Sequence, residues 1–446
     1  MRLLTSSLLA VATWVQAILA AQSSRTGYAI VPYDRAPSNY PGAPWSFQPD
    51  TTRQRICHVP VAPNGGDSAP AIIKAFQECG HNGKVIFDEH QIYHINSVMT
   101  TTGLSNVEVD VRGTLLWSPD IQYWLGHSLP VGYQNQSTAW IFGGDKVHLY
   151  SSNQAGNFSG NGQVWYDFIS GQPHGQQSNY PRRPHQITFN GLTNSVVEGL
   201  NFWQSQMWTM TLIHSNNVLL QDIYVNNTNH KHELDFNTDG ADTIYANNIT
   251  FARWVVDNGD DGVTWKANST NIGVFDSVFY SGSGLAMGSI GQYPDRYEII
   301  ENIHVKNCAF HNTWNAVWAK TWTGVQKGYP PNGGGGGKGI IKNILFEDLT
   351  LDNVQQLWYV NQCTSFSGQV GDCNTSKFQI QDVTVRNAKG TVTQNYAAKL
   401  QCSGAAPCFN MAMENINLTY QGNKVTRYLC DFVSSTIGFQ CTQHPN

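Results

Sequence analysis

The sequence predicts an all-β chain wound into a parallel β-helix, a solenoid in which each coil stacks on the previous one. Two observations predict this fold. Short runs of alternating β-branched or aromatic residues recur at intervals of 23, 31, 23, 31 and 41 residues, each opened by an asparagine: Asn194, Asn217, Asn248, Asn271, Asn302 and Asn343. No helical segment with a 3.6-residue period separates these runs, so one repeat is one coil of strands and turns.

A β-sandwich is the competing fold. Its turns would recur about every 8 to 12 residues and would pair neighbouring strands as hairpins with Asn-Gly-type loops. Here the same sequence pattern recurs only once per coil. The solenoid is therefore the preferred prediction.

The chain begins with Met1 and Arg2, continues through a short apolar stretch and reaches small residues near position 20. This pattern is typical of a signal peptide over residues 1–20, so we expect a secreted, extracellular protein with a single domain over residues 21–446. A membrane anchor is the alternative. Hydroxyl residues interrupt the apolar stretch, and no other stretch approaches the roughly 20 apolar residues of a spanning helix, so we expect no membrane association.

Two further segments differ from the coils. Residues 68–79 form the one clear amphipathic helix, with a Ser and a Pro at its start, and a helix there would cover the open end of the solenoid. The glycine run 333–337 follows two prolines and interrupts the coil spacing, which predicts a surface loop.

The 9 cysteines fall mainly into locally spaced couples. Local disulfides in an oxidising compartment are the simplest account of this spacing, and no spacing resembles a zinc site. Cys308 is left over within a strand-like run, where a buried free thiol is expected. The predicted disulfides are Cys57 with Cys79, Cys363 with Cys373, Cys402 with Cys408, and Cys430 with Cys441.

Seven Asn-X-Ser/Thr sequons would accept glycans if the chain passes through a eukaryotic secretory pathway, and we expect several of them to be used. They begin at Asn135, Asn157, Asn226, Asn248, Asn268, Asn374 and Asn417.

The composition excludes one class of partner and favours another. Charged residues make up 13% of the chain and the formal net charge is -5, so there is no basic surface for nucleic acid. The 14 Trp and 19 Tyr suit a surface that stacks on sugar rings, although a large all-β core also uses aromatic residues.

Three polar positions are spaced by one coil. Asp239, Asp261 and Ser283 are separated by 22 residues at each step. In a solenoid, equal intervals place residues on successive rungs about 4.8 Å apart, so these side chains should form a column on one outer face. Asp260 joins them because the glycines at 259 and 262 allow a bend that turns both neighbouring aspartates outward.

Stacked carboxylates repel one another, and this repulsion keeps one acid protonated while another stays ionised. Glycoside hydrolysis needs such a pair, one acid for the leaving oxygen and one base for the attacking water. Ordinary turns are the first alternative, since Asn-Thr-Asp-Gly and Gly-Asp-Asp-Gly are common turn sequences. A calcium site is the second, because Asp242 adds to the oxygen-rich cluster. We expect no metal and no cofactor.

At these residues the chain resembles the polygalacturonase family of glycoside hydrolases, family 28. The resemblance covers about residues 60 to 420 and rests on Asn237-Thr238-Asp239 followed by Asp260-Asp261. It implies a right-handed parallel β-helix with an N-terminal capping helix, and an inverting hydrolysis. Asp260 would be the general acid, and Asp239 with Asp261 would activate water. Inversion calls for carboxyl groups about 6.5 to 9.5 Å apart.

Two family motifs are altered. Gly-His-Gly is replaced by a triplet centred on Ser283, and Arg-Ile-Lys by Trp318-Ala-Lys320, so the His and the Arg are lost and the Lys remains. Lys320 offers carboxylates only a point charge in place of a bidentate fork. The segment 283–291 looks like the rhamnogalacturonan-hydrolysing branch of the family, whereas 291–293 resembles the fungal exo-polygalacturonases.

We therefore predict an exo-acting hydrolase of the pectin backbone, with rhamnogalacturonan or its oligomers as substrate and rhamnose or galacturonic acid as product. A galacturan 1,4-α-galacturonidase is the alternative within the family. A non-catalytic wall-binding protein and a polysaccharide lyase are alternatives of other classes. We expect a monomer. The candidate substrate-binding residues are Lys320, Ser283, Trp318 and Arg296, with His230, His232, Trp314 and Trp322 as weaker candidates for a sugar groove.

Overall fold

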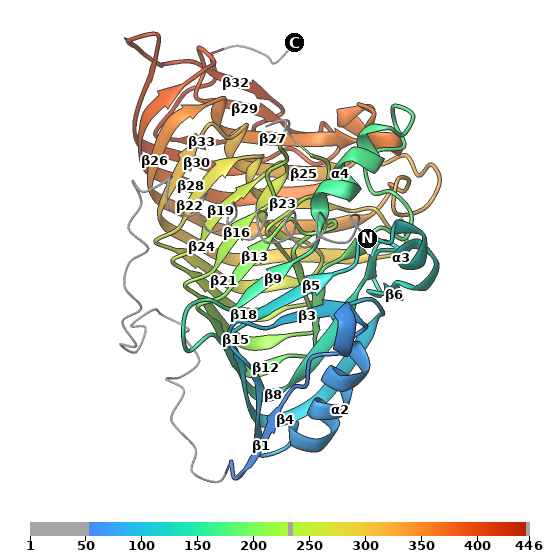
Figure 1. Cartoon of the computed structure of the whole chain (residues 1–446). Helices are drawn as coiled ribbons and strands as arrows, with labels where there is room; N and C mark the ends of the chain where they lie inside the picture. Colours follow the sequence, from blue (N-terminus) through green and yellow to red (C-terminus); the bar gives the residue numbers. More distant parts are fainter. Residues whose placement is uncertain (1–52, 231–234, 443–446) are drawn as a thin grey trace. The chain divides into compact units, whose positions relative to one another are not determined.

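The computed structural model describes residues 53–230 and 235–442, which belong to a unit spanning residues 38–446. The predicted signal peptide, residues 1–20, lies outside the described residues. Almost all described strands pair in parallel with strands of the coils before and after them, which confirms the parallel β-helix (Figure 1). Within the described residues, no helix is long and apolar enough to cross a membrane.

Each complete coil contributes strands to three stacks. The first stack contains β1 (Arg55–His58), β2 (Gly83–Phe87), β4 (Met99–Val111), β8 (Trp140–Tyr150), β12 (Thr193–Glu198), β15 (Asn216–Gln221), β18 (Asn247–Ala252), β21 (Ser269–Phe275), β24 (Tyr297–His311), β26 (Lys338–Val354), β28 (Lys377–Val392), β30 (Phe409–Tyr420) and β33 (Thr436–Ile437). The second stack contains β3 (Ile92–Ile95), β5 (Thr114–Trp117), β9 (Asn157–Ser159), β13 (Asn201–Trp203), β16 (Tyr224–Asn226), β19 (Val255–Asn258) and β22 (Val278–Ser281), and it continues into the long strand β24.

The third stack carries the candidate site. It contains β11 (Ile187–Asn190), β14 (Met210–Ile213), β17 (Ala241–Ile244), β20 (Asp261–Trp265), β23 (Gly284–Ile290), β25 (Asn315–Trp322), β27 (Gln356–Thr364), β29 (Ala398–Gln401) and β32 (Tyr428–Asp431).

The remaining elements lie outside these stacks. A small separate sheet contains β6 (Leu129–Pro130), β7 (Ser137–Thr138) and β10 (Pro184–His185), and β31 (Asn423–Lys424) pairs antiparallel with β30. The helices are η1 (Pro63–Gly65), α2 (Ala69–Cys79), α3 (Ile121–His127), α4 (Gly162–Ser170), η2 (Phe366–Gly368) and η3 (Cys373–Thr375).

The core consists of inward-facing side chains that stack in columns from coil to coil. One aliphatic column of the first stack is at most 2% exposed at every step, and runs through Val218, Ile249, Ile272, Ile303, Ile344, Val383 and Met411. Because parallel strands stack in register, a residue type that repeats once per coil becomes a continuous buried ladder.

The recurring asparagines lie within the strands of the first stack, each at a left-handed residue where the backbone bends. Asn217, Asn248, Asn302 and Asn343 have φ between 54° and 60°, the left-handed region that asparagine tolerates better than most residues. The Nδ2 of Asn302 donates to the Oδ1 of Asn271 at 2.9 Å, and the Nδ2 of Asn343 donates to the Oδ1 of Asn302 at 3.2 Å. The repeat seen in the sequence is therefore an asparagine ladder that links successive coils.

The predicted capping helix is confirmed as α2. It buries Ile72, Ala75 and Phe76 against the first coils, and the Phe76 ring meets the rings of Trp140 and Phe142 edge to face at 6.2 and 5.8 Å. Apolar side chains of the first coils would otherwise face water at this end of the solenoid.

All four predicted disulfides are present, and Cys308 is a buried free thiol as expected. The bridge between Cys57 and Cys79 ties the end of α2 to β1.

The prediction of a loop at residues 333–337 is confirmed, but its predicted surface position is wrong. These five glycines are buried, and their backbone N–H groups donate to the carbonyl groups of Tyr329, Lys327, Gln292, Thr323 and Gly291. A Cβ at Gly335 would lie 2.3 Å from the Val325 oxygen, so the lack of a side chain is what admits this segment.

We predict that Asn302→Ala lowers the free energy of unfolding by about 1 to 3 kcal/mol, because it breaks two ladder hydrogen bonds and strains a left-handed turn. Asn302→Gly loses the same bonds but tolerates the turn, so its effect should be smaller. Denaturant unfolding of both variants measures the difference. Equal losses would show that the left-handed conformation is not the constraint.

Candidate active site

The third stack places the predicted polar column as expected. Asp239 precedes β17, Asp260 immediately precedes β20, Asp261 is the first residue of β20, and Ser283 precedes β23. The Gly240 N–H donates to the Asp261 carbonyl at 3.0 Å, and the Ser283 N–H donates to the Asp260 carbonyl at 2.8 Å. The equal spacing in the sequence has therefore become adjacency on neighbouring rungs.

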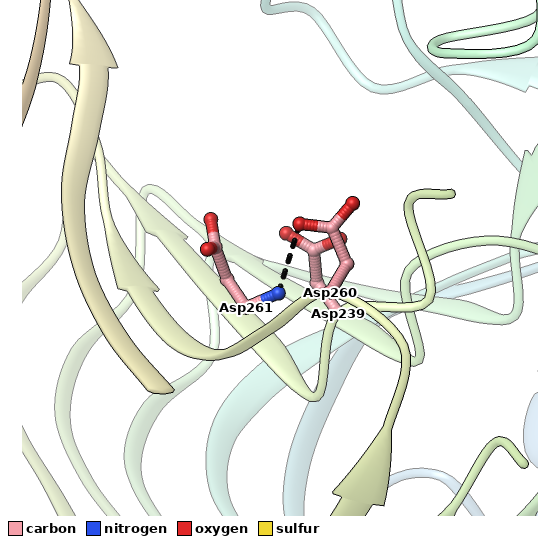
Figure 2. A group of neighbouring side chains, drawn as sticks. All are labelled: Asp239, Asp260 and Asp261. Atoms are coloured by element: carbon pink, nitrogen blue, oxygen red, sulfur yellow. Dashed lines mark hydrogen bonds between the residues drawn. The ribbon is translucent and has the colours of Figure 1, made fainter. Parts of the chain in front are cut away.

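The three aspartate side chains are neighbours, with Asp239 and Asp260 side by side and the carboxylate of Asp261 next to them (Figure 2). One carboxylate oxygen from each of Asp239, Asp260 and Asp261 lies within 4.8 Å of the others. The side chain of Asp260 is fixed by the backbone, since its Oδ2 accepts from the Asn237 N–H at 2.8 Å and its Oδ1 from the Asp261 N–H at 2.9 Å. Asp239 and Asp261 are buried and Asp260 is half-buried.

Close backbone contact between coils makes this convergence possible. A Cβ at Gly240 would lie 2.3 Å from the Gly262 carbonyl oxygen, so a glycine is required immediately after Asp239. The turn that contains Asp239 and Gly240 can then lie directly on the turn that contains Asp261 and Gly262.

Burial and mutual repulsion raise two pKa values in the cluster. The pKa of Asp239 lies well above its ordinary value, first because burial disfavours the charged form and then because Asp260, Asp242 and Asp261 repel a further negative charge. The pKa of Asp260 is raised by burial and by Asp261, in spite of the two backbone N–H groups that it accepts. The cluster therefore retains protons at a pH where isolated aspartates have released them.

Two cations lie close to the carboxylates. The Nζ of Lys320 donates to the Oδ2 of Asp261 at 2.5 Å, and Asp261 and Asp260 raise the pKa of Lys320 although burial alone would lower it. Arg183 is 1% exposed and donates to the backbone carbonyls of Gln206 and Phe236. Burial lowers the pKa of Arg183 to about 10, and Asp239 and Asp260 oppose that shift.

The other predicted substrate-binding residues are distributed more widely. Ser283 is buried in the column, and Trp318 lies beside Lys320, whose Nζ is 4.3 Å from the centre of the Trp318 ring. Arg296 is exposed and lies with two tyrosines rather than with the aspartates. Its guanidinium is 3.9 Å from the centre of the Tyr293 ring and donates to the Tyr245 hydroxyl at 3.0 Å.

The four weaker candidates for the sugar groove differ in exposure and position. Trp314 is 48% exposed, and its backbone N–H donates to the Gly282 carbonyl next to Ser283. Trp322 is buried at 4% exposure. His230 is exposed, and His232 lies outside the described residues.

Sequence reasoning missed several charged and aromatic neighbours of the site. Asp242 entered only as part of a calcium alternative, and Arg183, Trp208 and Lys266 were not considered. Lys266 follows Asp242 by 24 residues, close to one coil, so the same spacing rule could have paired them. Arg183 and Trp208 carry no such signal because they lie in turns.

Exposure changes sharply along the outward-facing column of the third stack. Five residues, from two rungs before the aspartates to the rung after Asp261, are 0% exposed: Thr188, Thr211, Asp242, Thr264 and Ala286. The next three are partly exposed: Trp318, Tyr359 and Lys399. The column is therefore covered on the N-terminal side of the aspartates and as far as Ala286, and it is partly exposed from Trp318 onward.

Aromatic side chains contribute to the covered part. His185 of β10 stacks on Trp208 with ring centres 4.2 Å apart, and its Nδ1 is 2.8 Å from the Thr211 hydroxyl. The Trp208 ring also lies 4.7 Å from the Nζ of Lys266. The small sheet that includes β10 thus closes over the outer face of the first coils of this stack.

Paired carboxylates on the outside of a parallel β-helix, next to a partly exposed tryptophan, define a candidate polysaccharide-cleaving enzyme. Comparisons with known proteins agree with this class. Residues 91–438 match the model of glycosyl hydrolases family 28. The chain is 48% identical over 391 residues to alpha-L-rhamnosidase rgxB of Aspergillus niger, covering 87% of this chain and 90% of that protein. It is 33% identical to exopolygalacturonase X of Aspergillus niger, covering 88% and 89% of the two chains.

The solved structures share the fold at low identity. The endo-xylogalacturonan hydrolase of Aspergillus tubingensis superimposes with a TM-score of 0.72 at 21% identity, covering 87% of this chain and 99% of that chain. The exopolygalacturonase of Thermotoga maritima gives 0.68 at 18% identity, covering 88% and 94%. The chain belongs to family 28 of the glycosyl hydrolases.

The raised pKa of Asp239 predicts a pH-dependent stability. Because the folded state holds this proton more tightly than the unfolded state, the stabilisation is complete below about pH 4 and is lost as the pH rises through the folded pKa. Asp239→Asn should therefore unfold at a higher temperature than the unmodified protein at pH 7, with a smaller gain at pH 4. The exposed Asp295→Asn is the control and should show no such difference. A gain for Asp239→Asn that is the same at both pH values would contradict the prediction.

Proposed function

We propose that the protein is a secreted, exo-acting hydrolase of the pectin backbone that removes a terminal rhamnose or galacturonic acid from rhamnogalacturonan or its oligomers. The observation that carries the exo assignment is the one-sided exposure of the third stack. A polymer that crosses the aspartates in both directions needs accessible surface on both sides. Thr188 and Thr211, on the rungs before the aspartates, are 0% exposed. Trp318 and Tyr359, on later rungs, are partly exposed, which favours a chain end at the aspartates.

Asp260 is suited to the role of general acid. It is the least buried of the three aspartates, and its raised pKa keeps a proton available near its carboxyl for the glycosidic oxygen. As the bond from the anomeric carbon to that oxygen breaks, the proton of Asp260 moves to the leaving oxygen. Water attacks the anomeric carbon and loses a proton to Asp239 or Asp261.

The spacing of the carboxylates favours a shared water. The oxygens lie within 4.8 Å of one another, closer than the separation of carboxyl groups expected for inversion. A water that bonds to two such oxygens at about 2.7 Å each spans this distance. We therefore propose inversion from the membership of family 28 and not from the spacing of the carboxylates. Proton NMR of the first product formed tests it: the anomer opposite to the substrate linkage is expected, and the same anomer would overturn it.

Trp318 and its neighbours favour a weakly charged sugar beside the reaction centre. The Trp318 ring stacks on Tyr359 with ring centres 5.7 Å apart and planes 19° from parallel, which presents an aromatic surface for the C–H face of a sugar. Lys320 is already paired with Asp261 and offers uronates no bidentate fork. Together with the 48% identity to a rhamnosidase, these contacts favour rhamnose as the released sugar.

A galacturan 1,4-α-galacturonidase is the second candidate. Lys320 is positively charged, and the 33% identity to an exopolygalacturonase covers most of both chains. A non-catalytic wall-binding protein would keep the aromatic surface, but it would have no need for three mutually repelling aspartates with two displaced pKa values. A lyase would yield unsaturated ends that absorb in the ultraviolet.

Secretion, glycosylation and a monomeric state complete the proposal. Four disulfides suit an oxidising compartment. Asn135, Asn268, Asn374 and Asn417 are the sequon asparagines with exposed side chains. Asn226 is buried, so we propose that it carries no glycan. Peptide mapping of the secreted protein before and after deglycosylation tests these sites.

Product analysis by chromatography tests the proposed function. The unmodified protein should convert a rhamnogalacturonan oligomer of defined ends into a saturated monosaccharide and the oligomer shortened by that one sugar, with no fragments from internal cleavage at early times. Asp260→Asn should lower kcat by about 100- to 10,000-fold, because a general acid is lost while the fold stays intact. Early fragments of two or more sugars released without monosaccharide would overturn exo action, and binding without any product would favour the non-catalytic alternative. Activity that is lost with a chelator would favour a metal at the aspartates.

Substitutions of Trp318 test the aromatic surface. We predict that Trp318→Ala raises KM by about 10-fold, the loss of roughly 1.4 kcal/mol of stacking, whereas Trp318→Phe retains most of the binding. Steady-state kinetics on one oligomer measures both. A KM that is unchanged in Trp318→Ala would place the bound chain elsewhere.

A further inference from the structure

The partly exposed part of the third stack ends in a lysine. Trp318, Tyr359 and Lys399 occupy the same outward position on three successive rungs, because Trp318 pairs with Tyr359 and Tyr359 pairs with Lys399. The two neighbours of Lys399 within β29 are 0% exposed, so its side chain points to the other face of the strand, away from the core. The next residue in the column, Leu429, is buried. Lys399 therefore lies at the far end of the surface that begins at Trp318.

Lys399 has no acidic partner among the residues that the structure describes. Its Nζ forms no ion pair and donates no hydrogen bond to any of them, and it lies 5.7 Å from the centre of the Tyr359 ring. Lys320, on the rung of Trp318, differs because its Nζ is paired with Asp261. The ammonium group of Lys399 is therefore available to an anionic ligand, and the nearest aromatic ring fixes where that ligand would meet it.

Two aromatic rings form a fixed surface between the aspartates and Lys399. The rings of Trp318 and Tyr359 stack with their centres 5.7 Å apart, and the Tyr359 hydroxyl donates to the Oε1 of Gln401 at 3.1 Å. At about 4.8 Å per rung, Lys399 stands roughly 10 Å beyond Trp318. A sugar chain that leaves the aspartates over these rings would reach Lys399 with a sugar that takes no part in the cleaved bond.

We propose that Lys399 forms a remote subsite that binds the carboxylate of a galacturonate residue several sugars away from the cleaved bond. The inference rests on the proposed function, in which the bound chain extends over Trp318 and Tyr359. Rhamnogalacturonan alternates a neutral sugar with a galacturonate, so a chain that lies on this surface presents carboxylates at regular intervals. An ammonium group recognises a carboxylate as a point charge, without the fixed orientation that a guanidinium requires. The rings hold the faces of the sugars, and Lys399 selects a chain that is acidic.

Calorimetry in the Asp260→Asn background tests the subsite without hydrolysis. The probes are rhamnogalacturonan oligomers long enough to span from the aspartates to Lys399, and the same oligomers after carboxyl reduction, which replaces each carboxylate with a primary alcohol. Addition of Lys399→Met should weaken binding of the acidic oligomer by about three- to five-fold at low salt, the range of a partly exposed charge pair. Binding of the carboxyl-reduced oligomer should stay the same.

Two further variants control for charge and for side-chain volume. Lys399→Arg keeps the positive charge and should keep the affinity for the acidic oligomer. Lys389→Met removes an equal charge from an exposed position in β28 of the first stack, and it should weaken the binding of neither oligomer. The loss caused by Lys399→Met should also shrink at high salt, which screens an accessible charge pair.

The outcomes separate the subsite from the proposed function. Equal losses for the acidic and the carboxyl-reduced oligomer would overturn the subsite, because the change would then not depend on the carboxylate. Binding by Lys399→Met that matches binding by Lys389→Met would overturn it as well, and hydrolysis by the unmodified protein would still support the proposed function. Binding that depends on Lys399 and on the carboxylates, without hydrolysis of any pectic substrate, would overturn the proposed function and support the subsite.

Discussion

The register between parallel coils is the constraint on which the rest of the structure depends. Because each rung lies directly on the previous one, a side chain in one coil has its counterpart about 4.8 Å away in the next. Apolar positions therefore become core columns, asparagines become a ladder, and acidic turns become a cluster. Asp239 and Asp261 are 22 residues apart in the chain and adjacent in space for this reason alone.

Stacking like charges opposes folding, and the surrounding chain offsets this with cations from distant coils. Lys320 pairs with Asp261, Lys266 pairs with Asp242, and the charges of Asp239 and Asp260 act on the buried Arg183. These cations come from different rungs and favour the ionised carboxylates, which offsets part of the repulsion. Burial and the repulsion among the aspartates nevertheless raise the pKa values of Asp239 and Asp260.

The sequence predicted whatever repeats once per coil. The solenoid, the aspartate column, the capping helix and the four local disulfides all follow from periodicity or short spacing. The sequence pattern did not predict contacts made by residues in connecting segments of unequal length. Arg183 and Trp208 reach the site from turns, Arg296 lies with tyrosines, and the glycines 333–337 are buried because neighbouring backbones approach them closely. The covered end of the third stack depends on residues such as His185, whose place no periodicity reveals.

A crystal structure of Asp260→Asn with a bound rhamnogalacturonan oligomer would locate the substrate directly. The terminal sugar should lie at Asp239 and Asp261, and the chain should extend over Trp318 and Tyr359, with no sugar beyond Asp242. An oligomer that continues past Asp242 on the covered side, or that binds away from the aspartates, would rule out exo action at this site.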